Sequence, residues 1–256
     1  MKILITAPLR QDPKIFDEFQ RSLDELVIPE GFTADRFFVV NDCPEVIPHI
    51  RRARYITHDT GDEYRKTDKT HIWTGDNLWK MSDLRNMTIQ FMLRYGYDYW
   101  LSADTDLVLN RHTLEYLLAA NKDIVSEVFW TEAEAGGIWC NAWMYDDGDV
   151  DHQLTKWREP GLYRVGMTGA LMLVKRRVFE AGVGYARIPN IRNALIGEDR
   201  WFCVRAACAG FDLWMDTHVP ATHLYTEKVY QEYMKRREQE HAERVQAGAE
   251  DHDRSV

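Results

Sequence analysis

The sequence predicts an α/β fold: a central, mostly parallel sheet flanked by helices, followed by a C-terminal helical extension. Short apolar runs of strand length alternate with segments whose apolar residues repeat at helical spacing. Several of these runs end in polar or acidic residues, which is typical of strands that reach the ligand-binding edge of such a sheet. The chain has 256 residues, 45% of them hydrophobic, and is therefore long enough to bury a sizeable core.

The first part of the chain alternates strand, helix and strand. Apolar runs predict strands over Lys2–Thr6, Arg36–Val40 and Arg54–Thr57. Between the first two, Asp12 and Pro13 are typical of a helix cap and first turn. The loop residues that we single out are Ala7, Pro8 and Arg10 after the first strand, and Asp42 after the second.

The stretch from Tyr97 to Leu109, YDYWLSADTDLVL, predicts a buried strand that runs into acidic residues. If the chain stays extended there, Asp104 and Asp106 point to the same side, because side chains alternate along a strand. Two carboxylates in a cleft repel each other unless a cation lies between them, and oxygen ligands suit Mg²⁺ or Mn²⁺. A polar strand exit, with Asp106 or Asn110 capping the next helix, is the competing interpretation.

Two segments lack periodicity and are expected to be loops. The first, from His58 to Trp79, is long for a connection inside a compact domain and is expected to close over a ligand. Ser82 then predicts the start of a helix that Gly96 ends. The second segment, from Trp130 to Pro160, is rich in Trp and acidic residues and is interpreted as an insertion or binding loop.

The second half of the chain continues the alternation. Strands are expected over Asp123–Phe129, Gly169–Val174 and Leu213–Asp216, and helices over Arg176–Ala181, Glu198–Ala209 and from Thr226 onward. Glu198 and Asp199 open a helix, where the macrodipole favours anions with or without a catalytic role. His223 is expected in a short loop after the last strand, where an ordinary structural role is the alternative to ligand binding.

Composition limits the partners and the compartment. The net charge of −9 opposes nonspecific binding to nucleic acid or anionic lipid, although Arg65, Lys66, Lys69 and Lys80 form a local basic group. No apolar stretch has the length of a membrane helix, and the N-terminus has no signal-peptide pattern. The four cysteines have no metal-ligand spacing and are interpreted as core thiols, so a cytoplasmic protein is expected.

The order and spacing of these motifs together resemble the GT-A glycosyltransferases, especially the family 2 type. KILITAPLR resembles the first strand and its nucleotide loop, and FFVVND the second strand with its terminal acid. KMSDLRN followed by WLSADTDLVL resembles the helix and Asp-x-Asp strand of the family. GMTGALMLVKRRVFEAGVGY resembles the acceptor-side strand and helix, and GEDRWFCVRAACAGFDLWMDTHVPATH the Glu-Asp helix with a metal-binding His. The similarity extends from Met1 to about Tyr225, and the chain departs from the pattern at NDCP and in the long loop after His58.

The resemblance implies a GT-A domain over 1–225, with a nucleotide-sugar-binding half (1–109) and an acceptor-binding half (110–225), then a C-terminal helix and frayed tail (226–256). It implies a nucleotide-diphosphate sugar donor, Mn²⁺ or Mg²⁺, and transfer to an acceptor hydroxyl with inversion. The implied donor-binding residues are Ala7, Pro8, Arg10, Asp42, Arg85 and Asp104. The implied metal ligands are Asp104, Asp106 and His223, and the implied general base is Asp199, with Glu198 beside it.

Two other functions remain open at this level: a catalytically inactive sugar- or nucleotide-binding module, and a nucleotidyltransferase. The glycine-poor loop APLRQDPK disfavours the latter. The acceptor is equally open between a saccharide, a small molecule and a modified nucleic acid. The irregular segments contain six tryptophans that either stack on a ligand or pack on one another, namely Trp73, Trp79, Trp130, Trp139, Trp143 and Trp157.

Overall fold

The computed structural model describes residues 1–61, 75–132, 137–144, 150–191 and 197–253. The strands are β1 (Lys2–Leu9), β2 (Thr33–Val40), β3 (Arg54–Thr57), β4 (Tyr99–Ser102), β5 (Leu107–Val108), β6 (Ile124–Glu132), β7 (Ile138–Cys140), β8 (Ala142–Trp143), β9 (Leu162–Val165), β10 (Met167–Thr168), β11 (Met172–Lys175) and β12 (Leu213–His223). The helices are α1 (Pro13–Asp24), η1 (Pro44–His49, a 3₁₀ helix), α2 (Gly75–Tyr95), α3 (Thr113–Ala119), α4 (Val150–Lys156), α5 (Arg176–Glu180), α6 (Glu198–Cys208) and α7 (Glu227–Asp253).

Within the described ranges, ten strands form one sheet in the order β3-β2-β1-β4-β11-β6-β12-β5, with β7 paired to β6 and β9 to β12. The pairs β2–β3, β1–β2, β1–β4 and β6–β12 are parallel, and β11 enters antiparallel between β4 and β6. The chain goes from β1 to β2 on one side, whereas β4 lies on the other side of β1. Strand order therefore reverses between β1 and β4, which is where sheets of this kind bind ligands.

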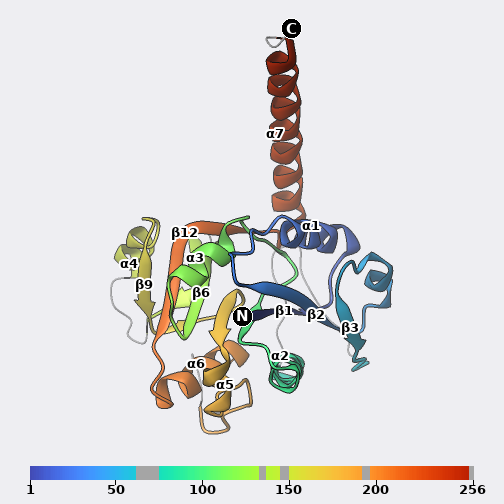
Figure 1. Cartoon of the computed structure of the whole chain (residues 1–256). Helices are drawn as coiled ribbons and strands as arrows, with labels where there is room; N and C mark the ends of the chain where they lie inside the picture. Colours follow the sequence, from blue (N-terminus) through green and yellow to red (C-terminus); the bar gives the residue numbers. More distant parts are fainter. Residues whose placement is uncertain (62–74, 133–136, 145–149, 192–196, 254–256) are drawn as a thin grey trace.

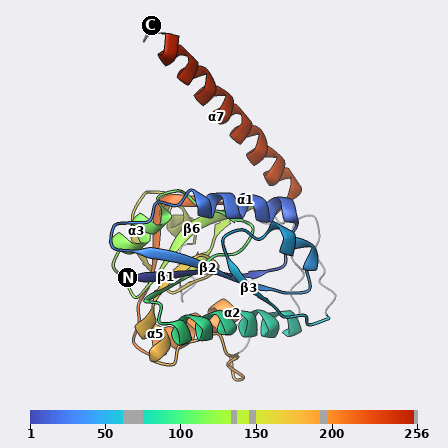
Figure 2. The same cartoon turned by 45° about the vertical axis from the view of Figure 1, so that its right-hand side comes forward.

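Helices cover both faces of the sheet, so the predicted α/β architecture is confirmed. Figures 1 and 2 show α1 and α3 on one face and α2, α5 and α6 on the other. Each face has its own buried cluster: Phe16, Phe19 and Leu114 lie on the α1 and α3 side, and Met92 and Phe202 on the α2 and α6 side. The strands between them are apolar on both faces, as expected for a covered sheet.

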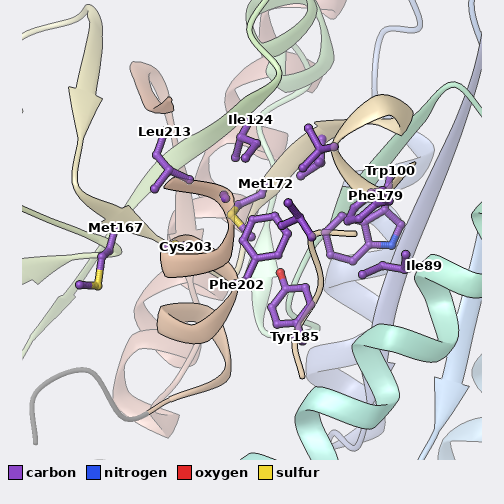
Figure 3. Packing of buried hydrophobic residues seen from close by; sticks show 14 of the residues in the cluster. Ile89, Trp100, Ile124, Met167, Met172, Phe179, Tyr185, Phe202, Cys203 and Leu213 are labelled. Carbon is purple, nitrogen blue, oxygen red and sulfur yellow. The ribbon is translucent and has the colours of Figure 1, made fainter. Parts of the chain in front are cut away.

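Buried aromatic side chains connect α2 and α6 to the sheet (Figure 3). The Trp100 ring lies edge-on to Phe179 at 5.5 Å and 6.1 Å from Tyr185, and Tyr185 stacks on Phe202 at 4.8 Å. The buried Trp100 indole donates its Nε1 hydrogen to Thr88 Oγ1 at 3.0 Å. This packing fixes the two helices that carry Arg85 and the Glu198–Asp199 pair.

Two predicted boundaries in the first half are wrong. Ala7 and Pro8 lie in β1, not in a loop. Pro8 is tolerated there because alternation turns its nitrogen to the β4 side, and the β1–β4 pairing ends at Thr6. Ser82 does not cap α2: the helix already begins at Gly75, and the Ser82 hydroxyl donates to the Leu78 carbonyl at 3.0 Å within it.

Other boundaries differ in the second half. Gly169 and Ala170 were expected in a strand, but β11 begins only at Met172 and these residues form a turn. His223 was expected in a loop, but β12 extends to it. The strand passes Pro220 because its pairing with β6 is irregular between Asp216 and Ala221, so the proline interrupts no regular ladder.

The two segments expected to be loops are only partly irregular. The one from Trp130 to Pro160 contains the end of β6 together with β7, β8 and α4. In the one from His58 to Trp79, residues 62–74 lie outside the described residues, and α2 takes up its last part. The expectation that this segment closes over a ligand therefore stays a prediction.

The C-terminal helix is present as predicted. Tyr233 of α7 is buried against Ile15 and Leu224, and its hydroxyl donates to Glu18 of α1 at 3.2 Å. Figures 1 and 2 show the rest of α7 projecting away from the sheet. None of the described helices, α7 included, is both long and apolar enough to cross a membrane.

The cysteine prediction is confirmed for Cys43, Cys140 and Cys203, which are buried and reduced. It is wrong for Cys208, which is also reduced but lies exposed in the last turn of α6.

Candidate active site

The candidate site lies at the carboxyl edge of the sheet, where the segments after β1, β2 and β4, the end of β12 and the start of α6 meet. Arg85 is its central cation. Its side chain is almost fully buried, and it donates from Nη1 to Ser102 Oγ at 2.8 Å and from Nη2 to Asp104 Oδ1 at 2.9 Å. Burial alone would lower the pKa of Arg85, but the surrounding carboxylates outweigh it and raise the pKa, so the guanidinium stays charged.

The same guanidinium faces the two acids that open α6. Glu198 Oε1 lies 4.0 Å from Arg85 Nη2, and Asp199 Oδ1 lies 4.0 Å from Arg85 Nε. Burial, more than any other cause, raises the pKa of both carboxyls, and for Asp199 the neighbouring Glu198 carboxylate raises it further. One cation therefore stands among three acids, including Asp104, and Asp199 is poised to exchange a proton.

A strained turn receives the Asp199 carboxylate. Leu171 N–H donates to the Gly169 carbonyl at 2.8 Å, which closes a γ-turn around Ala170, whose φ is +64°. The Ala170 N–H donates to Asp199. A Cβ atom on Gly169 would lie 2.0 Å from Asp199 Oδ2, so only glycine leaves room for the carboxylate.

Asn141 holds this turn in place. Its Nδ2 donates to the Gly169 carbonyl at 3.1 Å and to the Glu127 carbonyl at 3.0 Å, and its Oδ1 accepts from Phe129 N–H at 3.0 Å. One buried amide thus links β6, the segment between β7 and β8, and the turn beneath Asp199. A satisfied buried network of this kind rigidifies the group that it supports.

A second pair of predicted residues, Asp106 and His223, also meets. The β5–β12 pairing places His223 opposite Leu107, and His223 Nε2 lies 3.3 Å from Asp106 Oδ2. The other ring nitrogen, Nδ1, hydrogen-bonds Thr131 Oγ1 at 2.8 Å. This contact orients the imidazole so that Nε2 faces the carboxylate.

The expected parallel presentation of Asp104 and Asp106 is wrong. The chain is not extended between them, because Leu107 N–H donates to the Asp104 carbonyl at 3.1 Å and closes a turn. As a result, Asp104 contacts Arg85 whereas Asp106 contacts His223.

The ligand atoms around Asp106 suit a cation that keeps some coordination positions for ligands from outside the protein. Among the described residues, no group of three or more His, Cys, Asp or Glu side chains is arranged to hold a metal ion. Asp106 and His223 supply one carboxylate and one imidazole, and Thr131 orients the imidazole from behind. Mg²⁺ commonly binds through one or two carboxylates and completes its shell with water and substrate phosphate, and Mn²⁺ accepts similar ligands. The residues therefore fit a divalent cation shared with a ligand.

Asp42 and Arg10, two of the predicted donor-binding residues, lie together, with 3.6 Å between Oδ2 and Nη1. Asp42 has φ +46° and accepts from the Thr60 and Gly61 backbone N–H groups at 2.8 and 3.0 Å. Burial alone would raise its pKa, but the hydrogen bonds from Thr60 and Gly61 and the charge of Arg10 lower it. Through these hydrogen bonds, Asp42 holds the segment after β3 against the end of β2.

Several predicted contacts remain untested. The side chain of Ala7 is fully buried in the core, so only its backbone could reach a ligand. Arg85 lies beneath Asp104, and its direct approach to a diphosphate stays a prediction. Trp73, Arg65, Lys66 and Lys69 lie outside the described residues.

The sequence analysis missed Gly169, Ala170, Asn141 and Thr131. None of them carries a titratable side chain, and their roles depend on contacts with residues far away in the sequence. The backbone conformation at Ala170 has no sequence signal, because alanine rarely adopts positive φ.

No family model and no curated protein matches the sequence, but solved structures resemble the fold. S. aureus TarS 1–349 in complex with UDP-GlcNAc aligns with a TM-score of 0.52 and 12% identity, covering 87% of this chain and 58% of that one. Its complex with UDP gives a TM-score of 0.53. The mannosyltransferase PcManGT from Pyrobaculum calidifontis, with GDP-Man and Mn²⁺, aligns with a TM-score of 0.50 and 13% identity, covering 92% of this chain and 60% of that one.

These similarities confirm the predicted GT-A-type fold, with its central, mostly parallel sheet and flanking helices. At 12–13% identity they establish the fold alone, because one fold carries many functions. The chain spans about three fifths of the length of the solved chains that it matches.

Proposed function

We propose that this chain is a metal-dependent glycosyltransferase that moves a sugar from a nucleotide-diphosphate sugar to an acceptor hydroxyl, with inversion at the anomeric carbon. The observation that carries the proposal is the position of Arg85 between Asp104 and Asp199. Asp104, at the proposed donor edge, and Asp199, whose pKa is raised, share one buried cation, so both carboxylates are held at fixed positions beside it. The solved structures of similar fold, bound to UDP-GlcNAc and GDP-Man, support a donor of this class.

Asp199 is the proposed general base. Its carboxylate accepts the proton of the acceptor hydroxyl as the oxygen attacks the sugar, and burial has raised its pKa toward the range in which a base works best. The Gly169–Ala170 turn and Arg85 hold it against rotation. One base without a covalent intermediate implies inversion.

Asp106 and His223 are the proposed metal ligands, and Asp104, fixed by Arg85, is the proposed donor contact at the same edge. When bound, the cation supplies positive charge where the diphosphate leaving group develops negative charge. Arg10 and Asp42 border the same edge after β1 and β2, which is the side assigned to the nucleotide. The assignment of 1–109 to the donor, 110–225 to the acceptor and 226–256 to an appendage belongs to this proposal, as does a cytoplasmic location.

Product analysis tests the proposal. Purified protein is incubated with UDP- and GDP-sugars and Mn²⁺ or Mg²⁺, and the released nucleotide is separated by chromatography. We expect free UDP or GDP, reversible loss of turnover on chelation, and no turnover by Asp106→Ala. Release of pyrophosphate would indicate nucleotidyl transfer, and nucleotide binding without turnover would indicate a binding module. Full activity in excess EDTA would contradict the metal assignment.

A further inference from the structure

The segment Ile138–Trp143, which comprises β7 and β8, exposes two indoles beside the candidate site. Trp139 is 47% exposed and Trp143 36% exposed, whereas Cys140, Asn141 and Ala142 between them are buried. Single exposed apolar residues are common, but large aromatic side chains gathered on one short rigid segment are typical of a binding surface.

Trp139 lies on the face that carries the proposed metal ligands. The antiparallel register of β6 and β7 places it directly opposite Thr131, so the two side chains point to the same side of the hairpin. The Thr131 hydroxyl is the group that hydrogen-bonds His223 Nδ1 at 2.8 Å. The exposed indole is therefore a neighbour of the Asp106–His223 pair.

Trp143 lies at the other end, toward the proposed base. The guanidinium carbon of Arg200 is 5.5 Å from the centre of the Trp143 ring, and Arg200 directly follows Asp199 in α6. Between the two indoles, Asn141 is fixed by its hydrogen bonds to Phe129, Glu127 and Gly169, and Gly169 belongs to the turn that receives Asp199. The segment is thus held rigidly against both ends of the site.

We propose that Trp139–Trp143 is the acceptor platform and that the acceptor is a neutral saccharide whose ring stacks on Trp139, with Trp143 bordering the same surface. This inference rests on the proposed glycosyl transfer. The C–H face of a sugar ring is apolar and fits an indole, while its hydroxyls stay free to reach a base such as Asp199. The acids of the site and the net charge of −9 oppose a polyanionic acceptor such as nucleic acid.

The matched control lies one residue away. Ile138 has the same exposed fraction as Trp139, 47%, but alternation along β7 turns its side chain to the opposite face. Trp139→Ala therefore removes the proposed platform, Trp139→Phe keeps a smaller aromatic face, and Ile138→Ala removes an equally exposed apolar group outside the site. Thermal unfolding of all three variants checks that the fold is intact.

The test measures binding of chitobiose, cellobiose and mannobiose to the full chain by saturation-transfer NMR and fluorescence titration, without donor. We expect at least one disaccharide to bind, Trp139→Ala to weaken it about tenfold, Trp139→Phe to retain most of the affinity, and Ile138→Ala to match the wild type. The inference is overturned if none of the three binds at millimolar concentration, or if Trp139→Ala and Ile138→Ala behave alike. It is equally overturned if an oligonucleotide binds through Trp139 and the disaccharides do not.

UDP and GDP are titrated with Mn²⁺ in the same preparations. Trp139-dependent disaccharide binding without any nucleotide binding would support the platform and contradict the proposed function. Nucleotide binding and donor turnover without disaccharide binding would support the proposed function and overturn the platform.

Discussion

Two acids at the same edge of the sheet differ in how the protein treats them. Asp42, after β2, accepts hydrogen bonds from Thr60, Gly61 and Asn41 and lies near Arg10, so its pKa is lowered. Asp199, at the start of α6, accepts the Ala170 N–H and lies 4.0 Å from Arg85, but burial outweighs both and raises its pKa. The comparison shows that a carboxylate with many hydrogen-bond donors stays ionised and serves a structural role. A buried carboxylate with few donors is able to take up a proton.

The largest expected effect separates Asp199 from its neighbour. Asp199→Asn keeps the size of the side chain but cannot accept a proton, so kcat should fall by about 10²–10⁴-fold with donor KM little changed. Glu198→Gln should retain more of the rate and lose more stability or acceptor affinity. Steady-state kinetics of both variants provide the measurement, and the reverse pattern would assign the base to Glu198.

The pH profile sharpens the same point. Asp199 must lose its proton to act as a base, and its pKa is raised. The increase of kcat with pH should therefore occur at higher pH than the range near 4 in which an ordinary Asp titrates. Measuring kcat from pH 5 to 9 tests this in the wild type. A rate that is flat over that range would return Asp199 to an ordinary ionised carboxylate.

A substitution away from the acid should have a similar effect on rate. Gly169→Ala introduces a Cβ that would lie 2.0 Å from Asp199 Oδ2, so the carboxylate must move out of the turn. We expect kcat to fall by about 10²-fold or more, because displacement of a positioned group by about 1 Å has that cost. Both Gly169→Ala and Asp199→Asn remove the function of the Asp199 carboxylate. The double variant should therefore be no slower than the slower of the two single variants. Full additivity would show that Gly169 acts elsewhere.

Substitution of Asp42 should lower stability and raise donor KM, because Asp42 is also an implied donor-binding residue, with kcat little changed. Asp42→Ala removes the acceptors of Thr60 and Gly61 and should lower the free energy of unfolding by about 1–3 kcal/mol. Asp42→Asn should lower the free energy of unfolding by less, because asparagine tolerates the φ of +46°. Since folding lowers the pKa of Asp42, its contribution is present above the unfolded value near 4 and is lost as the pH falls through the folded value. Urea unfolding at pH 7 and pH 3 should therefore show a smaller difference in the free energy of unfolding between the wild type and Asp42→Ala at the lower pH.

Glu127 tests whether a raised pKa is sufficient for function. Its carboxyl is fully buried near Thr113 and Asp216, and burial raises its pKa well above the ordinary value. The unfolded chain releases this proton near pH 4 and the folded chain does not, so the wild type loses stability relative to Glu127→Gln as the pH rises. While only the folded chain holds the proton, the free energy of unfolding of the wild type should fall relative to that of the variant by about 1.4 kcal/mol per pH unit between pH 5 and pH 8, with kcat unchanged. A large loss of rate would contradict the view that Glu127 lies outside the site.

The sequence allowed the fold and the acids to be predicted because both leave local signals. Apolar runs mark strands β1, β2, β4 and β6, and acids at the first turn of α6 are visible without a structure. Ser82 was misplaced because a residue typical of a cap can also bond back inside a helix, as it does with Leu78. His223 was misplaced because the last strand was expected to end at Asp216, whereas β12 continues past an irregular pairing with β6.

The parts that could not be predicted depend on residues brought together from far apart. Arg85 faces Asp199 across 114 positions of sequence, and Asn141 reaches Gly169 across 28. Neither pairing has a local pattern, since each becomes useful only once the sheet has formed. The separation of Asp104 from Asp106 has a different cause: a turn replaces the extended chain that alternation assumes.

The positive φ of Ala170 has a consequence for laboratory evolution of this protein. An alanine held at +64° carries strain of roughly 1–3 kcal/mol, which glycine would relieve at the cost of a looser chain. Selection for heat resistance alone should therefore tend to enrich Ala170→Gly, and selection for turnover should tend to restore alanine. The residue found at position 170 would then indicate whether a population was selected for heat resistance or for turnover.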